Sequence, residues 1–283
     1  MTGDELRNPQ LDRLLQSSLH FEPMCGNVTR IRSPHSTGWR TLPGLMCAQP
    51  QRGRAVMSLD GRALRVRTGE LMVLPAGVYH RVDVTTPTAV SRWAHVNYFV
   101  MHSLDLFSLL SVPPVVPRKL GRRVGDEIES WVTTEAAGGN PLLRHAQRNA
   151  FGYRLLALLS EVCSLKPEAE RNLDGIAAVR AVIEHMNRNL GQPISRDALA
   201  EVAGMSRAQF HRVFTQAMGC SPVRFLRSIR LRLAQQLLIS TGEPVKVIAQ
   251  RCGYEDTFVF SKAFKRDSGL SPSAYRLRTR ELR

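Results

Sequence analysis

The chain has 283 residues, enough for two domains that each bury a core. Its composition is 43% hydrophobic and 22% charged, which excludes a disordered or low-complexity protein. Lys and Arg number 39 against 24 Asp and Glu, so the net charge is +15. This excess predicts a polyanionic partner, and charge alone leaves nucleic acid and an acidic membrane surface both open.

Cysteine use and the first residues bear on the compartment. The five cysteines are an odd number without CxxC spacing: Cys25, Cys47, Cys163, Cys220 and Cys252. They are typical of buried free thiols in a reducing compartment and not of a disulfide framework or a zinc site. Residues 1–5 lack a basic start followed by an apolar run, and no run of about 18 apolar residues occurs. We therefore expect a cytoplasmic protein without a leader or a membrane span.

Residues 27–100 predict a series of short strands. The candidates are 41–48, 54–60, 62–67, 70–74, 79–85 and 90–100, separated by proline and glycine. Asp60-Gly61 indicates a two-residue hairpin, since glycine takes a positive φ without penalty. Several short strands at this spacing predict a small β-sandwich or β-barrel.

Helices follow a boundary at residues 113–117, Pro-Pro-Val-Val-Pro, which cannot be helical. Apolar residues at helical intervals predict helices over 118–136 and 141–163. One stripe of the second helix is apolar: Phe151, Leu155, Leu158, Leu159 and Val162. We expect this helical pair to form a homodimer contact, and internal packing is the alternative. Polar residues 166–174, with Pro167, predict a linker.

The C-terminal part is basic and contains a repeat. Residues 171–283 hold 19 Lys and Arg against 9 Asp and Glu, while residues 1–170 hold 20 against 15. Residues 198–204 recur as 247–253. Five later residues, Phe210, Phe214, Gly219, Ser221 and Pro222, recur 50 positions further on as Phe260, Phe264, Gly269, Ser271 and Pro272. An internal repeat of this length indicates a duplicated structural module.

Each copy predicts a helix-turn-helix. A first helix ends at Gly204 or Gly253, where glycine can take the left-handed conformation. Ser206 or Asp256 then caps a second helix, whose two phenylalanines lie four residues apart on one face. A Ser-Pro pair starts a third helix. This order of elements is typical of DNA-binding proteins.

The opposite face of each second helix predicts the DNA contacts. It carries Ala208, His211, Arg212 and Thr215 in the first copy and Phe258, Ser261, Lys262 and Lys265 in the second. Arg207 and Thr257 stand at the helix starts, where backbone N–H groups favour phosphate. Arg212 and Lys262 occupy matched positions, and both can donate to guanine or phosphate in a major groove. A solvated basic face is the alternative.

The predicted helix over 221–239 spaces the two motifs. Its 19 residues give about 28 Å at roughly 1.5 Å per residue. Successive major grooves on one side of DNA lie roughly 34 Å apart. We therefore expect both second helices to contact one side of a duplex about one turn apart. Further candidates for phosphate contacts on this helix are Arg224, Arg227, Arg230 and Arg232.

These residues resemble the AraC/XylS family of bacterial transcription regulators. The matching segments include Leu199-Ala200, Gly204-Met205-Ser206, Arg212-Val213-Phe214, Cys252-Gly253-Tyr254, Phe260-Ser261-Lys262-Ala263-Phe264, Gly269-Leu270-Ser271-Pro272 and Tyr275-Arg276. The resemblance spans about residues 175–278. It implies a seven-helix DNA-binding domain whose third and sixth helices, 206–218 and 257–268, enter adjacent major grooves, and it implies RNA polymerase as a partner. Phe258 departs from the family pattern, in which a small polar residue is more usual, so its role stays open between thymine-methyl contact and packing.

The N-terminal region resembles the cupin-like effector domain of the same family. Residues 69–80 fit the pattern G-x5-P-x-G-x2-H, with Val84 in place of a closing asparagine. Residues 36–79 contain no histidine, so we expect neither a metal nor another cofactor, and metal binding by His80 with His95 is the alternative. The candidate effector-binding residues are His80, Trp93, His95 and Asn97, the last three being alternate residues of one strand. They suit a polar small molecule, and core packing is the alternative.

Together these features predict an α+β protein of two domains. We expect a cupin-like, effector-sensing β-barrel domain at 20–112, a helical dimerisation segment at 113–170, and an all-α double helix-turn-helix domain at 171–283. The expected function is that of a homodimeric transcription regulator that binds promoter DNA and responds to a small molecule. No catalytic nucleophile motif or glycine-rich phosphate loop occurs, so we expect no enzymatic activity. The alternatives are a metal-dependent cupin enzyme with a DNA-binding appendage and an effector-independent DNA-binding regulator.

Overall fold

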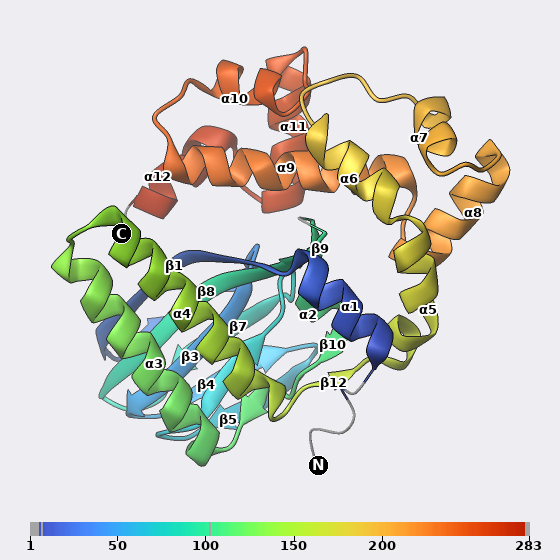
Figure 1. The fold of residues 1–283 in the computed structure, drawn as a ribbon. Helices are drawn as coiled ribbons and strands as arrows, with labels where there is room; N and C mark the ends of the chain where they lie inside the picture. The colour runs from blue at the N-terminus through green and yellow to red at the C-terminus, as the bar shows by residue number, and fades with distance from the viewer. Residues whose placement is uncertain (1–5, 7, 102, 281–283) are drawn as a thin grey trace. The chain divides into compact units, whose positions relative to one another are not determined.

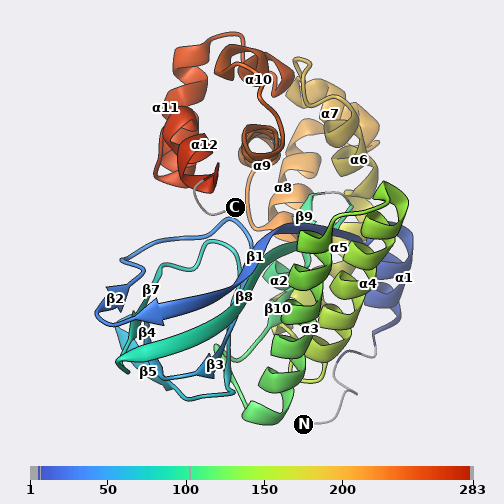
Figure 2. The same ribbon diagram turned by 90° about the vertical axis from the view of Figure 1, so that its left-hand side faces the viewer.

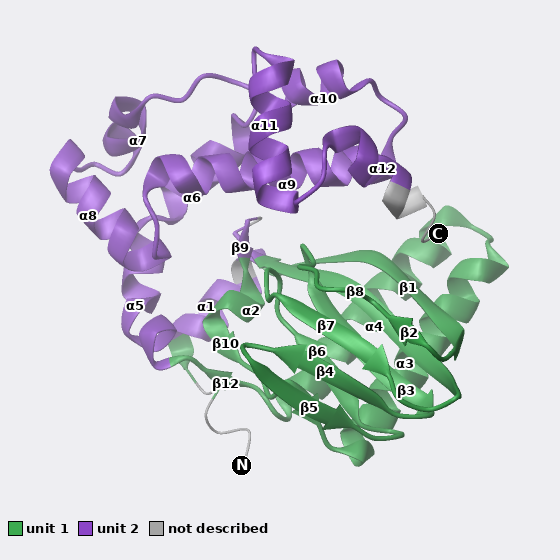
Figure 3. Cartoon of the chain, turned by 180° about the vertical axis from the view of Figure 1, so that it is seen from behind, with its two compact units in different colours: residues 1–9, 19–99, 105–166 green, residues 10–18, 100–104, 167–283 purple. Residues whose placement is uncertain are grey.

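The chain folds into two compact units in the computed structural model, which describes residues 6, 8–101 and 103–280 (Figure 3). Unit 1 comprises residues 1–9, 19–99 and 105–166, and unit 2 comprises residues 10–18, 100–104 and 167–283. Residues 1–5, on which the expectation of no leader depends, lie outside the described residues. Unit 1 holds the sheets, and unit 2 is mainly helical.

The strands form antiparallel sheets. They are β1 (His20–Arg32), β2 (His35–Ser36), β3 (Leu45–Arg52), β4 (Ala55–Leu59), β5 (Arg62–Val66), β6 (Leu71–Leu74), β7 (His80–Val84), β8 (Thr88–Val100), β9 (Leu104–Asp105), β10 (Leu110–Ser111), β11 (Val115–Val116) and β12 (Ser164–Leu165). One sheet has the order β1-β8-β3-β6-β11, with β9 beside β8, and a second has the order β2-β7-β4-β5. A small third sheet pairs β10 with β12.

The two larger sheets pack face to face around an apolar core. This core combines Met46, Ala48, Met72 and Leu74 from the first sheet with Ala55, Met57, Val66 and Val82 from the second. Among the described residues no ladder joins the two sheets, so the predicted closed barrel is wrong and the sandwich alternative describes the unit. One edge strand of each sheet, β11 in the first and β2 in the second, has only two residues, which offers few backbone N–H and C=O groups for a ladder to the other sheet.

The predicted hairpin forms at Asp60-Gly61. The last pair of the β4–β5 ladder is Leu59 with Arg62. The two loop residues, Asp60 and Gly61, have φ values of 50° and 70°, as a type I′ turn requires. By contrast, β1, with 13 residues, was not among the predicted strands. β8, also of 13 residues, begins two residues before the strand predicted at 90–100. The register of their ladder shifts between Pro23 and Cys25, and this bulge admits a proline that otherwise argues against a strand.

Two helices cover one face of the sheet that contains β1 and β8: α3 (Arg118–Ala137) and α4 (Pro141–Ser160) (Figure 1). The Tyr98 hydroxyl of β8 donates to the carbonyl of Gly152 in α4 at 2.6 Å. Arg92 of β8 is buried and pairs with Asp126 and Glu129 of α3 at 2.6 and 3.0 Å. Polar as well as apolar contacts therefore attach the helices to the sheet. Both helices were predicted, at 118–136 and 141–163.

The apolar stripe of α4 belongs to the core of unit 1. Phe151, Leu155 and Leu159 are buried, and Phe151 stacks on Trp131 of α3 with ring centroids 4.6 Å apart. Internal packing, the alternative to a dimer contact, accounts for this stripe. Other apolar side chains of α4 are exposed, namely Leu142, Leu143 and Tyr153.

The remaining helices, apart from α2 (Leu106–Leu109) of unit 1, build unit 2. They are α1 (Pro9–Ser18), α5 (Pro167–Ala178), α6 (Arg180–Arg188), α7 (Arg196–Val202), α8 (Arg207–Met218), α9 (Pro222–Ser240), α10 (Val245–Arg251), α11 (Thr257–Ser268) and α12 (Pro272–Arg280). None of the helices within the described ranges has the length and apolar character needed to cross a bilayer.

The linker predicted at 166–174 is wrong, because α5 begins at Pro167. Proline is favoured at the first position of a helix, where its missing N–H has no intrahelical partner. Glu168 and Glu170 lie in the first turn, where negative charge is stabilised by the helix dipole. Leu173 and Ile176 are buried and fix the helix to its neighbours.

The long helix α9 joins the two predicted helix-turn-helix motifs, α7–α8 and α10–α11. Near its start, Phe225 packs edge-on against Phe214 of α8 with ring centroids 5.5 Å apart. Near its end, Leu237 and Leu238 share an apolar cluster with Phe260 and Phe264 of α11. Figure 2 looks along α9, with the first motif on one side and the second on the other. One 19-residue helix therefore supports both motifs.

Candidate nucleic-acid interface

Side-chain caps fix the starts of the two second helices, α8 and α11. The Ser206 hydroxyl accepts a hydrogen bond from the N–H of Gln209 at 3.3 Å. The Asp256 carboxylate accepts from the N–H groups of Phe258 and Val259 at 2.6 and 2.8 Å. Both caps were predicted from the repeat. The caps differ in charge, because serine is neutral and aspartate carries a negative charge.

Phenylalanines fix the rotation of each second helix about its axis. The pairs Phe210/Phe214 and Phe260/Phe264 are buried, with ring centroids 5.5 and 5.7 Å apart. A helix repeats every 3.6 residues, so the side opposite these pairs must face away from the core. The predicted contact residues lie on that side.

The outward faces carry a matched pair of cations. Arg212 of α8 and Lys262 of α11 are exposed, and no ion pair engages either of them among the residues the structure describes. The other exposed residues of the predicted set are Arg207, Ala208, His211, Phe258 and Lys265, while Thr257 and Ser261 are half-buried. The structure thus brings most of the predicted set onto two solvent-facing surfaces.

Two predicted contact residues differ from the expected free, solvent-facing arrangement. The Thr215 hydroxyl oxygen is buried and lacks a hydrogen-bond partner among the described residues, so in this conformation it does not face DNA. Arg207 forms an ion pair with Asp197 of α7, which offsets its charge. The sequence could not show either arrangement, because both depend on how α7 and α8 pack.

Two of the four arginines predicted to reach phosphate from α9 bind the protein instead. The Arg230 guanidinium donates to the carbonyls of Leu190 and Gln192 at 2.9 and 2.6 Å, and burial lowers its pKa. Arg232 donates to the carbonyl of Ser103. These two side chains hold loops against α9.

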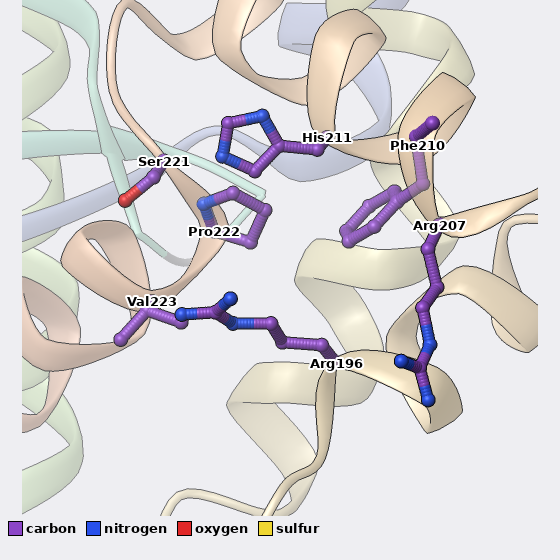
Figure 4. A pocket seen from close by; sticks show the side chains of 8 residues that line it. Arg196, Arg207, Phe210, His211, Ser221, Pro222 and Val223 are labelled. Atoms are coloured by element: carbon purple, nitrogen blue, oxygen red, sulfur yellow. The ribbon is translucent and has the colours of Figure 1, made fainter.

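A pocket of about 430 Å³ lies beside α8 (Figure 4). It is lined by Arg196, Arg207, Ala208, Phe210, His211, Ser221, Pro222 and Val223. Figure 4 shows Arg196 extending toward Val223 at the start of α9, with the His211 ring near Ser221 and Pro222. A guanidinium, an imidazole and a helix N-terminus facing one space favour an anion. Arg196 was not among the predicted contact residues. Its place at the start of α7 is the one feature of the sequence that could have suggested an anion contact.

The candidate effector residues of unit 1 cluster between the sheets. Trp93 donates from its indole N–H to the Thr29 hydroxyl at 2.9 Å, and its ring lies 5.0 Å from that of His95 between centroids. Burial lowers the pKa of His95 to about 3, and the charge of Arg40 and the proximity of His80 act in the same direction. His95 is therefore neutral at physiological pH.

His80 presents a buried acceptor. Its Nδ1 donates to the carbonyl of Val78 at 2.9 Å, because a carbonyl can only accept. In the neutral ring Nε2 then carries a lone pair, and this buried atom has no partner in the described part of the chain. Burial is the main cause that lowers the pKa of His80. Arg40 lies next to His80 through a β-bridge, a proximity that the sequence did not reveal.

A separate cavity of about 490 Å³ opens in unit 1, lined by Leu59, Asp60, Arg62, Leu64, Val73, Leu74, Pro75, Val78, Val112 and Pro114. None of the four predicted effector residues lines it. Asn97 is buried, and Gly44 packs so closely against it that a Cβ at Gly44 would lie 2.7 Å from the Asn97 side-chain oxygen. Among the described residues, no group of three or more His, Cys, Asp or Glu side chains is placed to hold a metal ion.

Two helix-turn-helix motifs with exposed cations on their second helices define a DNA-binding protein. Residues 199–278 match the helix-turn-helix domain family. The chain is 29% identical to the RCS-specific HTH-type transcriptional activator RclR of Escherichia coli, over 78% of this chain and 80% of that protein. It is 27% identical to the MmsAB operon regulatory protein of Pseudomonas aeruginosa, over 78% and 69% of the two chains.

The fold is also similar over most of the chain to a solved structure. ToxT from Vibrio cholerae matches 92% of this chain and 97% of its own, with a TM-score of 0.52 and 11% identity. At that identity the likeness concerns the fold alone. Together with the two relatives, the matched domain identifies residues 199–278 as an AraC-type helix-turn-helix domain, and the chain is similar to transcription regulators that carry such a domain.

Proposed function

We propose that this protein regulates transcription by placing α8 and α11 in successive major grooves on one side of promoter DNA. The observation that carries the proposal is the matched pair Arg212 and Lys262, exposed at equivalent positions of two motifs that share α9. The 19 residues of α9 span about 28 Å, close to the roughly 34 Å that separates successive grooves.

The proposed DNA contacts divide into base and phosphate contacts. The set is Arg207, Ala208, His211, Arg212, Thr257, Phe258, Ser261, Lys262 and Lys265. The pocket beside α8 that Arg196 lines is proposed to bind a phosphate of the DNA backbone. Phosphate contacts of this kind fix the register of a recognition helix on the duplex. Thr215 is left out of the contact set, because its hydroxyl oxygen is buried.

Gel-shift titration of the full-length protein on promoter fragments tests DNA binding. We expect a specific fragment to outcompete random DNA by a factor of about 10³ or more, with affinity falling steeply as salt rises. Equal affinity for specific and random DNA would contradict sequence-specific regulation. Sequencing the fragments that the protein retains identifies the operator.

Unit 1 is proposed to bind a small polar effector. The unpartnered Nε2 of His80, the buried ring of His95 and the polar side chain of Asn97 support this. An effector that favours one arrangement of the protein would change its occupancy of the promoter.

A thermal-shift screen of the full-length protein against metabolites tests this, since a bound ligand raises apparent stability. A ligand whose shift disappears in His80→Ala supports the proposal, and a screen without any shift favours the effector-independent alternative. Metal analysis of the purified protein separates both from the cupin-enzyme alternative. A stoichiometric metal would contradict a purely regulatory role.

A homodimer that contacts RNA polymerase completes the proposal. Leu142, Leu143 and Tyr153 expose apolar surface on α4, and such patches favour protein contacts. Analytical ultracentrifugation of the wild-type protein and of Leu143→Glu tests the dimer. The wild-type protein is expected to sediment with the mass of two chains and the variant with the mass of one. A wild-type protein with the mass of one chain would contradict the dimer.

A further inference from the structure

The second recognition helix exposes apolar side chains where the first exposes smaller or polar ones. Phe258 is 77% exposed, the largest fraction among the large hydrophobic side chains that the structure describes, and its neighbour Val259 is 55% exposed. The corresponding residues of α8 are Ala208 and Gln209. An exposed apolar pair on a functional face indicates a surface that a partner covers.

Packing within unit 2 does not account for Phe258. The aromatic contacts of α11 with the core are made by Phe260, which meets Tyr254, and by Phe264, which meets Tyr275, each with ring centroids 5.3 Å apart. Phe258 stands two residues before Phe260, which places it on a different face of the helix. The sequence left two roles open for Phe258, packing and contact with a thymine methyl group, and its exposure argues against packing.

The lysines that follow Phe258 along α11 point to a polyanion as that partner. Lys262 and Lys265 are exposed and lie one and two turns further along the same face of α11. A positively charged face favours DNA over a second apolar protein surface. In a major groove the lysines could contact the phosphates of the DNA backbone while Phe258 and Val259 contact the bases. Thymine is distinguished there by its C5 methyl group, which is apolar.

The cap of α11 supports a contact with bases at this end of the helix. The Asp256 carboxylate is occupied by the N–H groups of Phe258 and Val259. An anionic cap disfavours a phosphate at the same helix start, whereas the neutral cap of α8 does not. The first turn of α11 is therefore better suited to contact base edges in the major groove than a phosphate.

We infer that Phe258 and Val259 read thymine methyl groups in the half of the DNA site that α11 contacts, while α8 reads its half through polar side chains. The inference rests on the proposed function, in which α11 enters a major groove. It assigns a sequence preference to one half of the operator and predicts that the two halves differ.

Uracil substitution tests this directly, because uracil lacks only the methyl group. The full-length protein is first used to select its site from random DNA, and each thymine is then replaced singly by uracil. Losing one apolar contact of this size is expected to weaken binding about fourfold, in the α11 half only. Phe258→Ser is expected to lose the uracil effect at the thymine that Phe258 contacts, and the double variant Phe258→Ser/Val259→Ser is expected to bind the thymine and uracil DNAs of that half equally.

Leu277→Ser is the matched control, since Leu277 of α12 is 62% exposed and lies on a helix outside the recognition faces. It is expected to keep the uracil sensitivity. Unchanged affinity of the wild-type protein for every uracil DNA would overturn the inference, as would full uracil sensitivity in Phe258→Ser. Normal DNA binding by Phe258→Ser with lost transcription would assign Phe258 to a protein partner instead.

The wild-type uracil series decides the matter even if Phe258→Ser were to fold poorly. Failure of the proposed function looks different, because the selection would then yield no preferred site at all.

Discussion

Removing the matched cations singly and together tests whether both motifs bind one duplex. Arg212→Ala and Lys262→Ala each remove one exposed cation and are expected to cost about 1–3 kcal/mol of binding free energy, or about 5- to 150-fold in affinity. The two sites lie on different helices supported by opposite ends of α9, about 28 Å long. At that separation the two losses are expected to add within about 0.5 kcal/mol.

The assay is a fluorescence-anisotropy titration of a labelled operator at several salt concentrations. Each lost phosphate contact is expected to lower the slope of log affinity against log salt by about one. Arg180→Ala is the matched control, since Arg180 of α6 is held by Glu184 at 2.8 Å. A silent single substitution, or a double variant no weaker than the weaker single variant, would refute binding by both motifs.

Three further predictions concern stability. Phe264→Ala empties a fully buried site and is expected to lower the free energy of unfolding by about 3–5 kcal/mol, and a urea titration that shows less than about 1 kcal/mol would contradict this. Gly253→Ala is expected to cost more than Gly269→Ala, because both glycines have a positive φ but only at Gly253 would a new Cβ lie 2.5 Å from the Leu190 carbonyl; equal melting temperatures for the two variants would count against the reasoning. Burial lowers the pKa of His95 from 6.5 to about 3. Between these two pH values the unfolded chain binds a proton on His95 that the folded chain does not bind. The free energy of unfolding therefore falls as the pH is lowered from above 6.5 towards 3. From pH 7.5 to pH 5 the loss is expected to be about 2 kcal/mol; His95→Gln should remove this part of the loss, and an unchanged pH dependence in that variant would show that His95 is not responsible.

Local signals in the sequence predicted the C-terminal motifs well. Ser206 and Asp256 cap their helices as expected, and Gly219 and Gly269 end them in the left-handed conformation. These features involve residues a few positions apart, so the pattern alone determines them. The duplication then confirmed each assignment in a second copy.

Features that depend on distant residues were not predictable. Pro167 is compatible with a linker or a helix start, and only the burial of Leu173 in α5 decides between them. The Thr215 hydroxyl lies on the predicted face but is covered by packing. Besides burial, the charge of Arg40 lowers the pKa of His95, because a β-bridge places Arg40 beside His80 on a separate strand. Closure of the sheets likewise depends on edge strands too short to produce a sequence pattern.

The spacing of the two half-sites in the operator tests the central proposal, that α9 holds both recognition helices against one side of a duplex. The affinity of the full-length protein is measured on the selected site and on sites lengthened between the halves by 5 and by 10 base pairs. Because α9 is a single helix of fixed length, both insertions are expected to reduce affinity to that of one half-site alone. Full affinity on either lengthened site would contradict the account.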